Sequence, residues 1–258
     1  MDCFHERVFY YWRHGFYGHV QYLCQKALIN NFNDLFLQIW HSLASGILGQ
    51  TEEAINIISK IKHRSDLSLL LIICKICIYE SSPNQHTDII IQLKNSIDDL
   101  AQTSNHFCLI QSIQVAIMFR NFNLALQLRK YLKEQSSIEG WLKLFLKKYQ
   151  SAEKIFDSVL KIEKNDLLAY YGQYILYLIT NQQSKSLDIY GHITRMYNFP
   201  EINIEKARYA SQHGKWDQAL IILDEYKQSF PTTIEIEIFS ALNSLVRNSD
   251  FEKASSSL

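Results

Sequence analysis

The stretch GKWDQALIILDEYKQSFP, residues 214–231, carries the signals of one amphipathic helix. A glycine precedes the helix, apolar residues recur at helical spacing, and Pro231 ends it because proline lacks a backbone donor and clashes with the preceding turn. Related segments occur along the chain: GFYGHV from residue 15, GQTEEA from 49, RNFNLA from 120, KKYQSA from 147, NQQSKS from 181 and SDFEKA from 249. The stretch therefore predicts a repeated unit.

Each segment ends in a small or aliphatic residue, which we call the anchor position. The anchors are Val20, Ala54, a weaker member near Ile89, Ala125, Ala152, Ser186, Ala219 and Ala254. Their successive separations are 34, 35, 36, 27, 34, 33 and 35 residues. A period near 34 built from two helices is typical of the tetratricopeptide repeat, and a small anchor lets its two helices approach closely.

Several pieces match the consensus of that repeat. Trp40-x2-Leu43-Ala44-x2-Ile47 is a conservative form of its first part, Ala152-x3-Phe156 reproduces its second part, and Pro231 follows Ala219 by twelve residues. Only 8 Gly and 3 Pro are present, too few for the many turns of a β-sandwich or barrel. The predicted fold is all-α, a right-handed α-solenoid of about seven and a half tetratricopeptide-type helix pairs.

The predicted organisation is one solenoid over residues 1–258, with local irregularities. The 27-residue step implies a short repeat near 126–160, whose first helix spans about 137–146 and contains Trp141. The last repeat, from residue 232, is incomplete and has no polar capping helix. We therefore expect either a shortened version of a longer protein or an end that docks onto a partner.

Composition and charge exclude several classes of function. The 26 basic and 26 acidic residues balance, so no net positive charge attracts the phosphate backbone of a nucleic acid. We therefore expect protein partners and no nucleic acid. The N-terminus carries charges where a signal peptide needs an apolar core, and the longest apolar run, residues 67–79, is too short to span a bilayer. No direct membrane insertion is expected. Five cysteines do not indicate a disulfide framework.

The motifs that resemble catalytic or metal sites are incomplete. Cys74-Lys-Ile-Cys77 has the CxxC spacing, but it lies in an apolar helical run, and we interpret the two thiols as buried packing. His5-Glu6 begins like a zinc-protease motif, yet Phe9 stands where the second histidine would be needed. The lysines from Lys143 to Lys164 alternate with acids and fit a solvated helix face. We predict no enzyme activity, cofactor, metal or small-molecule substrate.

The inner surface of the solenoid is the candidate partner site. Co-chaperones of this class hold a terminal carboxylate with Lys and Asn, but His5, Phe9 and Trp40 stand at the matching places. Apolar side chains, among them Phe36, Ile39 and Phe239, would instead suit an apolar partner segment in the groove. The alternative is that these three residues simply pack within the superhelix.

The order of the irregularities resembles one large family. The opening helix ends in Tyr10-Tyr11 and is followed by GHV at 18–20, GQTEEAI at 49–55, KIK at 60–62, DLS at 66–68, SPN at 82–84, Trp141-Leu142 and SDFEKAS at 249–255. This order of motifs is similar to that in the N-terminal region of the tetratricopeptide repeat protein 21 family. That family provides the largest tetratricopeptide-repeat subunit of intraflagellar transport complex A. The resemblance covers essentially the whole chain, but only about the first fifth of a usual family member.

The resemblance implies a non-catalytic scaffold in retrograde ciliary transport and cilium assembly. Its partners would be other subunits of intraflagellar transport complex A, and its location the cytoplasm, the cilium and the ciliary base. The long C-terminal solenoid of that family is absent from these 258 residues. The alternative function is a stand-alone tetratricopeptide-repeat adaptor or co-chaperone that binds a peptide segment outside the cilium.

Overall fold

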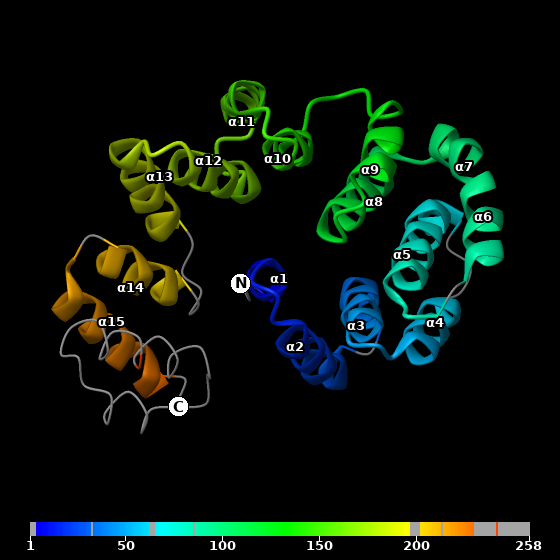
Figure 1. The fold of residues 1–258 in the computed structure, drawn as a ribbon, viewed down its shortest axis with the longest axis horizontal. Coiled ribbons are helices and arrows are strands. Elements are labelled where there is room, and N and C mark those ends of the chain that lie inside the picture. Colours follow the sequence, from blue (N-terminus) through cyan, green and yellow to red (C-terminus); the bar gives the residue numbers. More distant parts are fainter. Residues whose placement is uncertain are drawn as a thin grey trace. The chain divides into compact units, whose positions relative to one another are not determined.

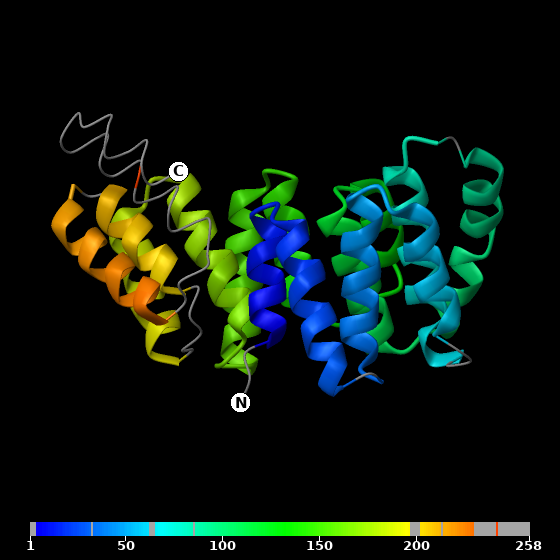
Figure 2. The same cartoon turned by 90° about the horizontal axis from the view of Figure 1, so that it is seen from below.

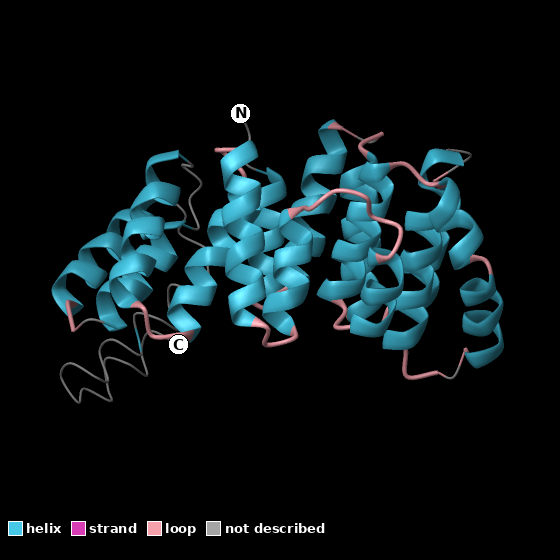
Figure 3. Cartoon of the chain, turned by 90° about the horizontal axis from the view of Figure 1, so that it is seen from above, coloured by secondary structure: helices cyan, strands magenta, loops and turns pink. Residues whose placement is uncertain are grey.

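The computed structural model describes residues 4–31, 33–61, 65–84, 86–196, 202–212, 214–229 and 241. Within these ranges every regular element is a helix, which confirms the predicted all-α fold class (Figure 3). The helices are α1 (Phe4–Arg13), α2 (Tyr17–Asn30), α3 (Leu35–Ile47), α4 (Thr51–Lys60), the 3-10 helix η1 (Ser65–Leu67), α5 (Ser68–Ser81), α6 (Thr87–Asn95), α7 (Ile97–Thr103), α8 (His106–Met118), α9 (Phe122–Arg129), α10 (Ser137–Phe145), α11 (Tyr149–Ile162), α12 (Leu167–Ile179), α13 (Gln183–Met196), α14 (Ile202–Gln212) and α15 (Trp216–Ser229).

The helices pack through two kinds of contact, as a repeat solenoid requires: within a helix pair, and between the first helices of successive repeats. First helices pack on the second helices that follow them, α3 on α4, α8 on α9, α10 on α11, α12 on α13 and α14 on α15. First helices also pack on one another from repeat to repeat, in the order α3, α5, α8, α10 and α12 (Figure 1). Figure 2 shows the helices of residues 8–196 side by side, with the chain passing up one and down the next. Each repeat thus buries its apolar faces against its neighbours.

The chain divides into two compact units, one of residues 8–196 and one of residues 1–7 with 197–258. The larger unit contains α2 to α13, and the smaller contains α14 and α15, which pack together around Ala207, Ala219 and Leu223. That residues 1–258 form a single solenoid stays a prediction. Ala254 and Phe239 lie outside the described residues.

One turn joins the two helices of a pair, and it recurs six times in the described residues. A residue with left-handed backbone follows the first helix; these residues are Gly15, Gly49, Arg120, Lys147, Asn181 and Gly214, with φ between 56° and 86°. The N–H of the next residue donates to the carbonyl five positions back at 2.8–2.9 Å, for example Gln50 to Ser45 and Lys148 to Lys143. This is the Schellman motif, which satisfies carbonyls left open at a helix end.

The anchor position follows the left-handed residue by five positions in all six turns. The side chains there are completely buried: Val20, Ala54, Ala125, Ala152, Ser186 and Ala219 are each 0% exposed. A larger side chain at this place would push the two helices apart, because helices that cross closely leave room only for small groups. The anchor positions predicted in these six repeats are therefore confirmed.

The third repeat departs from this pattern, and the anchor predicted near Ile89 is wrong. Its second helix does begin at Thr87, but Ile89 is 42% exposed and α6 buries none of its residues. The fully buried positions lie further on, at Ile97 and Ala101 of α7. The loop after α5 contains Pro83, none of its described residues takes the left-handed conformation, and the second helix of this repeat is divided into α6 and α7. The repeat then has three helices, as armadillo-type units can.

The predicted short repeat is present at α10. This helix spans Ser137–Phe145, which confirms the short first helix expected at 137–146. An ion pair of 2.8 Å joins Arg129 at the end of α9 to Glu139 on α10, and the Arg129 guanidinium also donates to the Leu132 carbonyl. Both side chains are largely buried, so these contacts hold the short connection between the two helices against the core.

Phe156 fills the space between two first helices. Its completely buried ring packs against Gly140 on α10 and Gly172 on α12, and a Cβ at either glycine would overlap the ring. Trp141 contacts the same ring edge-on at 6.3 Å between centroids. Glycine at these two places permits the close approach of α10, α11 and α12 that the bulky ring requires.

We expect Gly172→Ala to destabilise the protein by about 1–3 kcal/mol, because the added methyl group overpacks the Phe156 ring. Gly191→Ala is the matched control, since Gly191 lies inside α13 with no atom within 4 Å of an added Cβ. The control should stabilise by about 0.5–1 kcal/mol through the higher helix propensity of alanine. Urea unfolding followed by circular dichroism measures both; equal effects of the two substitutions would contradict the packing described for Phe156.

We expect Lys147→Gly to raise the thermal midpoint of unfolding. Lys147 has φ 59°, a conformation that costs a residue with a Cβ about 1–2 kcal/mol and costs glycine little. Lys148→Gly is the control, because Lys148 has φ −89° and gains nothing from glycine. A lower midpoint for Lys147→Gly than for Lys148→Gly would show that the left-handed turn is not formed.

Candidate interaction groove

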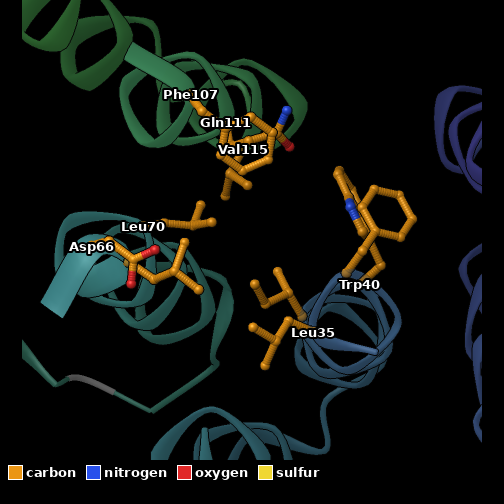
Figure 4. A pocket seen from close by; sticks show the side chains of 10 residues that line it. Leu35, Trp40, Asp66, Leu70, Phe107, Gln111 and Val115 are labelled. Atoms are coloured by element: carbon orange, nitrogen blue, oxygen red, sulfur yellow. The ribbon is translucent and has the colours of Figure 1, made fainter. Parts of the chain in front are cut away.

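A cavity of about 160 Å³ lies between three first helices of successive repeats, α3, α5 and α8. Figure 4 shows side chains from all three helices around the space. The described residues that line it are Leu35, Phe36, Ile39, Trp40, Asp66, Leu67, Leu70, Phe107, Gln111 and Val115. Eight of them are apolar, so the cavity is suited to an apolar group.

Two of the predicted partner-binding residues, Phe36 and Ile39, line this cavity. Ile39 is 5% exposed, and Phe36 is half-buried. Phe36 also contacts the rings of Phe9 and Trp40, at 5.9 Å and 5.8 Å between centroids. Both residues thus serve the packing of the solenoid and also form the cavity wall, and their role in partner binding stays a prediction.

The cavity residues that α5 and α8 contribute were not predicted from the sequence. Phe107, Gln111 and Val115 stand four residues apart on α8 and therefore share one face of that helix. Leu70 and Asp66 come from α5 and the turn before it. The four-residue spacing is evident in the sequence, but it does not reveal that this face of α8 lines a cavity together with α3. That requires knowing how the first helices stack.

Aromatic contacts hold the Trp40 side of the cavity in place. The Trp40 ring packs edge-on against Phe9 and Trp12, each at 5.1 Å between centroids. Trp12 in turn contacts Phe119 at 5.3 Å between centroids, and its Nε1–H donates to the Met118 carbonyl oxygen, with 3.5 Å between nitrogen and oxygen. These contacts join the first helix of the first repeat to the end of α8. The Trp40 ring, held on one side by this cluster, presents its remaining surface to the cavity.

The CxxC cysteines pack in the core, as predicted. Cys74 and Cys77 on α5 are 0% and 1% exposed, and Cys108 on α8 is also completely buried. Burial raises the pKa of the Cys74 thiol, and neighbouring Cys108 raises it further. Burial also raises the pKa of Cys77 and of Cys108. Because the thiolate is the reactive and metal-binding form, burial disfavours both reactivity and metal binding at these cysteines.

Within the described part of the chain, no group of three or more His, Cys, Asp or Glu side chains is placed to hold a metal ion. No helix described here is both long and apolar enough to cross a membrane. The lysines of α11 and its flanks, Lys148, Lys154, Lys161 and Lys164, are exposed, which confirms the solvated helix face expected for this segment.

Solved structures of tetratricopeptide-repeat proteins share this fold. A tetratricopeptide repeat protein from Parabacteroides merdae aligns with a TM-score of 0.52 and 12% identity, over 93% of this chain and 97% of that one. Yeast Tom70 aligns with a TM-score of 0.51 and 14% identity, over 98% of this chain and 67% of that one. At these identities the similarity shows the fold alone.

Curated relatives and a family model match the sequence itself. Tetratricopeptide repeat protein 21B of Mus musculus is 22% identical over 265 positions, and the Homo sapiens protein of that name is 21% identical; each match covers 96% of this chain. The chain spans 20% of the length of these relatives. The model of the family described as tetratricopeptide repeat protein 21 N-terminal ARM repeat matches residues 8–220. The chain therefore belongs to the tetratricopeptide repeat protein 21 family, in its N-terminal repeat region.

Proposed function

We propose that this chain is a protein-interaction scaffold that works with intraflagellar transport complex A in retrograde ciliary transport and cilium assembly. Family membership over residues 8–220 is the observation that carries the proposal. Repeat families of this kind are typically non-catalytic scaffolds, because stacked repeats build extended binding surfaces. The proposed partners are other subunits of that complex, and the proposed location is the cytoplasm, the cilium and the ciliary base.

The surface chemistry favours protein partners. The chain has 26 basic and 26 acidic residues, so no net charge draws it to nucleic acid or to an anionic membrane surface. The cavity between α3, α5 and α8 is lined mainly by Leu, Ile, Val, Phe and Trp. Such a lining can bury an apolar anchor of another protein, which is how most binding energy at interfaces arises.

Affinity purification of the tagged full chain from ciliated cells, with mass spectrometry and a localisation image, tests the proposal. We expect the other subunits of intraflagellar transport complex A to be enriched and the tagged chain to concentrate at the ciliary base. The control is Ala152→Leu, which overpacks a fully buried helix crossing and costs about 1–3 kcal/mol. This variant should recover fewer of the same subunits, because the binding surface depends on the stacked repeats.

A different set of partners would contradict the proposal. Enrichment of cytosolic chaperones, or no reproducible partner together with no ciliary signal, would favour the stand-alone adaptor instead. The proposal would likewise be contradicted if the tag alone recovered as much of the transport subunits as the folded chain does.

A further inference from the structure

We propose that the two adjacent turns after α8 and α10 form a surface that binds an acidic protein segment carrying one large apolar side chain. This turn surface consists of three cations and three apolar residues: Arg120, Lys147, Lys148, Phe122, Leu126 and Phe145. The inference rests on the proposed scaffold function but not on the ciliary assignment. It names the chemistry of a partner segment, which neither the family nor the relatives specify.

A ring contact brings the two turns together. Phe122 is the first residue of α9 and Phe145 the last of α10, and their rings stack at 5.8 Å between centroids, with 30° between the planes. Arg120 precedes Phe122 by two residues, and Lys147 follows Phe145 by two. Two residues of chain span at most about 7 Å between Cα atoms. A ligand that covers the rings therefore lies within reach of cations from both turns.

The apolar part of the turn surface is accessible and held in place. Phe145 is 45% exposed, and Leu126, one helical turn after Phe122 on the same face of α9, is 39% exposed. On its other side Phe145 contacts the ring of Trp141 at 6.0 Å between centroids, and the Trp141 Nε1–H donates to the Leu168 carbonyl at 2.9 Å. A ring held by its neighbours loses little conformational entropy when a ligand covers it.

The cations of the turn surface are available to a partner. Arg120, Lys147 and Lys148 are exposed, and within the described residues their side chains form no ion pair or hydrogen bond. No acidic residue occurs in segments 119–123 and 143–150. The carboxylate of Glu80 contacts Asn121 at 2.6 Å, but it is already paired with Lys94 at 2.7 Å. Three available positive charges favour a partner that supplies carboxylates.

The backbone at two of these cations gives an independent reason to assign them a role. Arg120 and Lys147 have φ 57° and 59°, a left-handed conformation that is unfavourable for a residue with a Cβ. Three of the other turns have glycine at this place, and the fourth has Asn181. Glycine adopts this conformation freely and asparagine is enriched in it, unlike arginine or lysine. Strained positions of this kind are typical of functional sites.

The charge of the whole chain indicates the class of partner. The chain has 26 basic and 26 acidic residues, so the turn surface is a local cluster on a neutral molecule. Nucleic acids and anionic membranes bind best to an extended positive field, which a neutral chain does not provide. A protein segment supplies a few carboxylates at short range and also an apolar side chain for the Phe145 ring. We therefore assign the surface to an acidic protein segment.

Selection of random twelve-residue peptides displayed on phage against the immobilised full chain tests the inference. We expect the enriched peptides to share a Phe, Leu or Trp with at least two Asp or Glu residues beside it. A synthetic, fluorescein-labelled copy of the most enriched peptide is then titrated with wild type and variants, and binding is followed by fluorescence anisotropy. Binding should weaken as salt is added, because the cations are exposed.

Glycine substitutions remove the charges without harming the fold. Arg120→Gly and Lys147→Gly should each weaken peptide binding about three- to tenfold, although each relieves a left-handed residue and should raise the thermal midpoint. Asn181→Gly is the matched control, since it changes the same place in another turn and removes no charge. It should leave binding unchanged. Lost binding in a more stable protein cannot be attributed to misfolding.

A second pair of variants tests the apolar contact. Phe145→Ala should weaken peptide binding about tenfold, because it removes the exposed ring that the apolar side chain covers. Ile162→Ala is the control, since Ile162 is 84% exposed and lies outside the turn surface. It should leave binding unchanged. Circular dichroism at the titration temperature checks that both variants remain folded.

The inference is overturned if no peptide is enriched, if the enriched peptides are basic or lack a large apolar residue, or if Arg120→Gly and Lys147→Gly bind as tightly as Asn181→Gly. It is also overturned if fluorescein-labelled oligouridine RNA or phosphatidylserine vesicles bind more tightly than the peptide and lose affinity in the same variants. Such a result would assign the surface to nucleic acid or to a membrane.

Failure of this inference is distinguishable from failure of the proposed function. If wild type and the double variant Arg120→Gly/Lys147→Gly recovered the transport subunits equally and neither bound a peptide, the scaffold function would stand without this surface. If the selected peptide bound as expected but the transport subunits were not recovered, the turn surface would stand and the ciliary assignment would fail.

Discussion

The structure depends on one local constraint, a fixed separation of five residues along the chain. It joins the left-handed residue at the end of each first helix to the completely buried anchor of the second helix. The left-handed residue reverses the chain and satisfies the open carbonyls through the Schellman bond. The anchor then lies in the first turns of the second helix, where the two helices approach most closely. One reversal and one small side chain therefore set both the direction and the spacing of each pair, and repetition of the pair builds the solenoid.

The third repeat departs from the pattern of the other six pairs. Pro83 stands in the connection after α5, none of the described residues there takes the left-handed conformation, and the second helix divides into α6 and α7. Ile89 and Ile91 remain exposed as a result, and Ile97 provides the buried contact. The first helix of this repeat, α5, still stacks between α3 and α8, so the series of first helices continues through the irregular unit. The candidate groove lies on this continuous series.

The sequence predicts the features that depend on short separations along the chain. The turn residues and the anchors are five residues apart, so the glycines at 15, 49 and 214 and the anchors that follow them, Val20, Ala54 and Ala219, were recognisable. The buried CxxC was predictable too, because its spacing lies within one apolar helix. The prediction at Ile89 was wrong because a fixed period assumes one continuous second helix in every repeat, whereas the second helix of this repeat is divided into α6 and α7.

The groove could be predicted only in part. Phe36 and Ile39 lie on the helix whose consensus is clearest, but Leu70 and Phe107 meet them only through the stacking of three helices, which no local pattern encodes. The Trp12 contact with Phe119 joins residues more than a hundred positions apart and has no sequence signal at all. Family membership was predictable from the order of short motifs along the chain, such as the GHV at 18–20 and the SPN at 82–84. These motifs mark the turns and short helices in the order in which they follow one another.

Amide hydrogen exchange of the full chain, resolved by NMR, tests the central claim most directly. The account predicts slow exchange for the N–H groups that close the six Schellman turns, those of Phe16, Gln50, Asn121, Lys148, Gln182 and Lys215. The N–H of Asn84, in the exposed connection of the third repeat, should exchange much faster. If the six amides exchanged as fast as that of Asn84, the turns would not be formed in solution and the constraint on which this account rests would be absent.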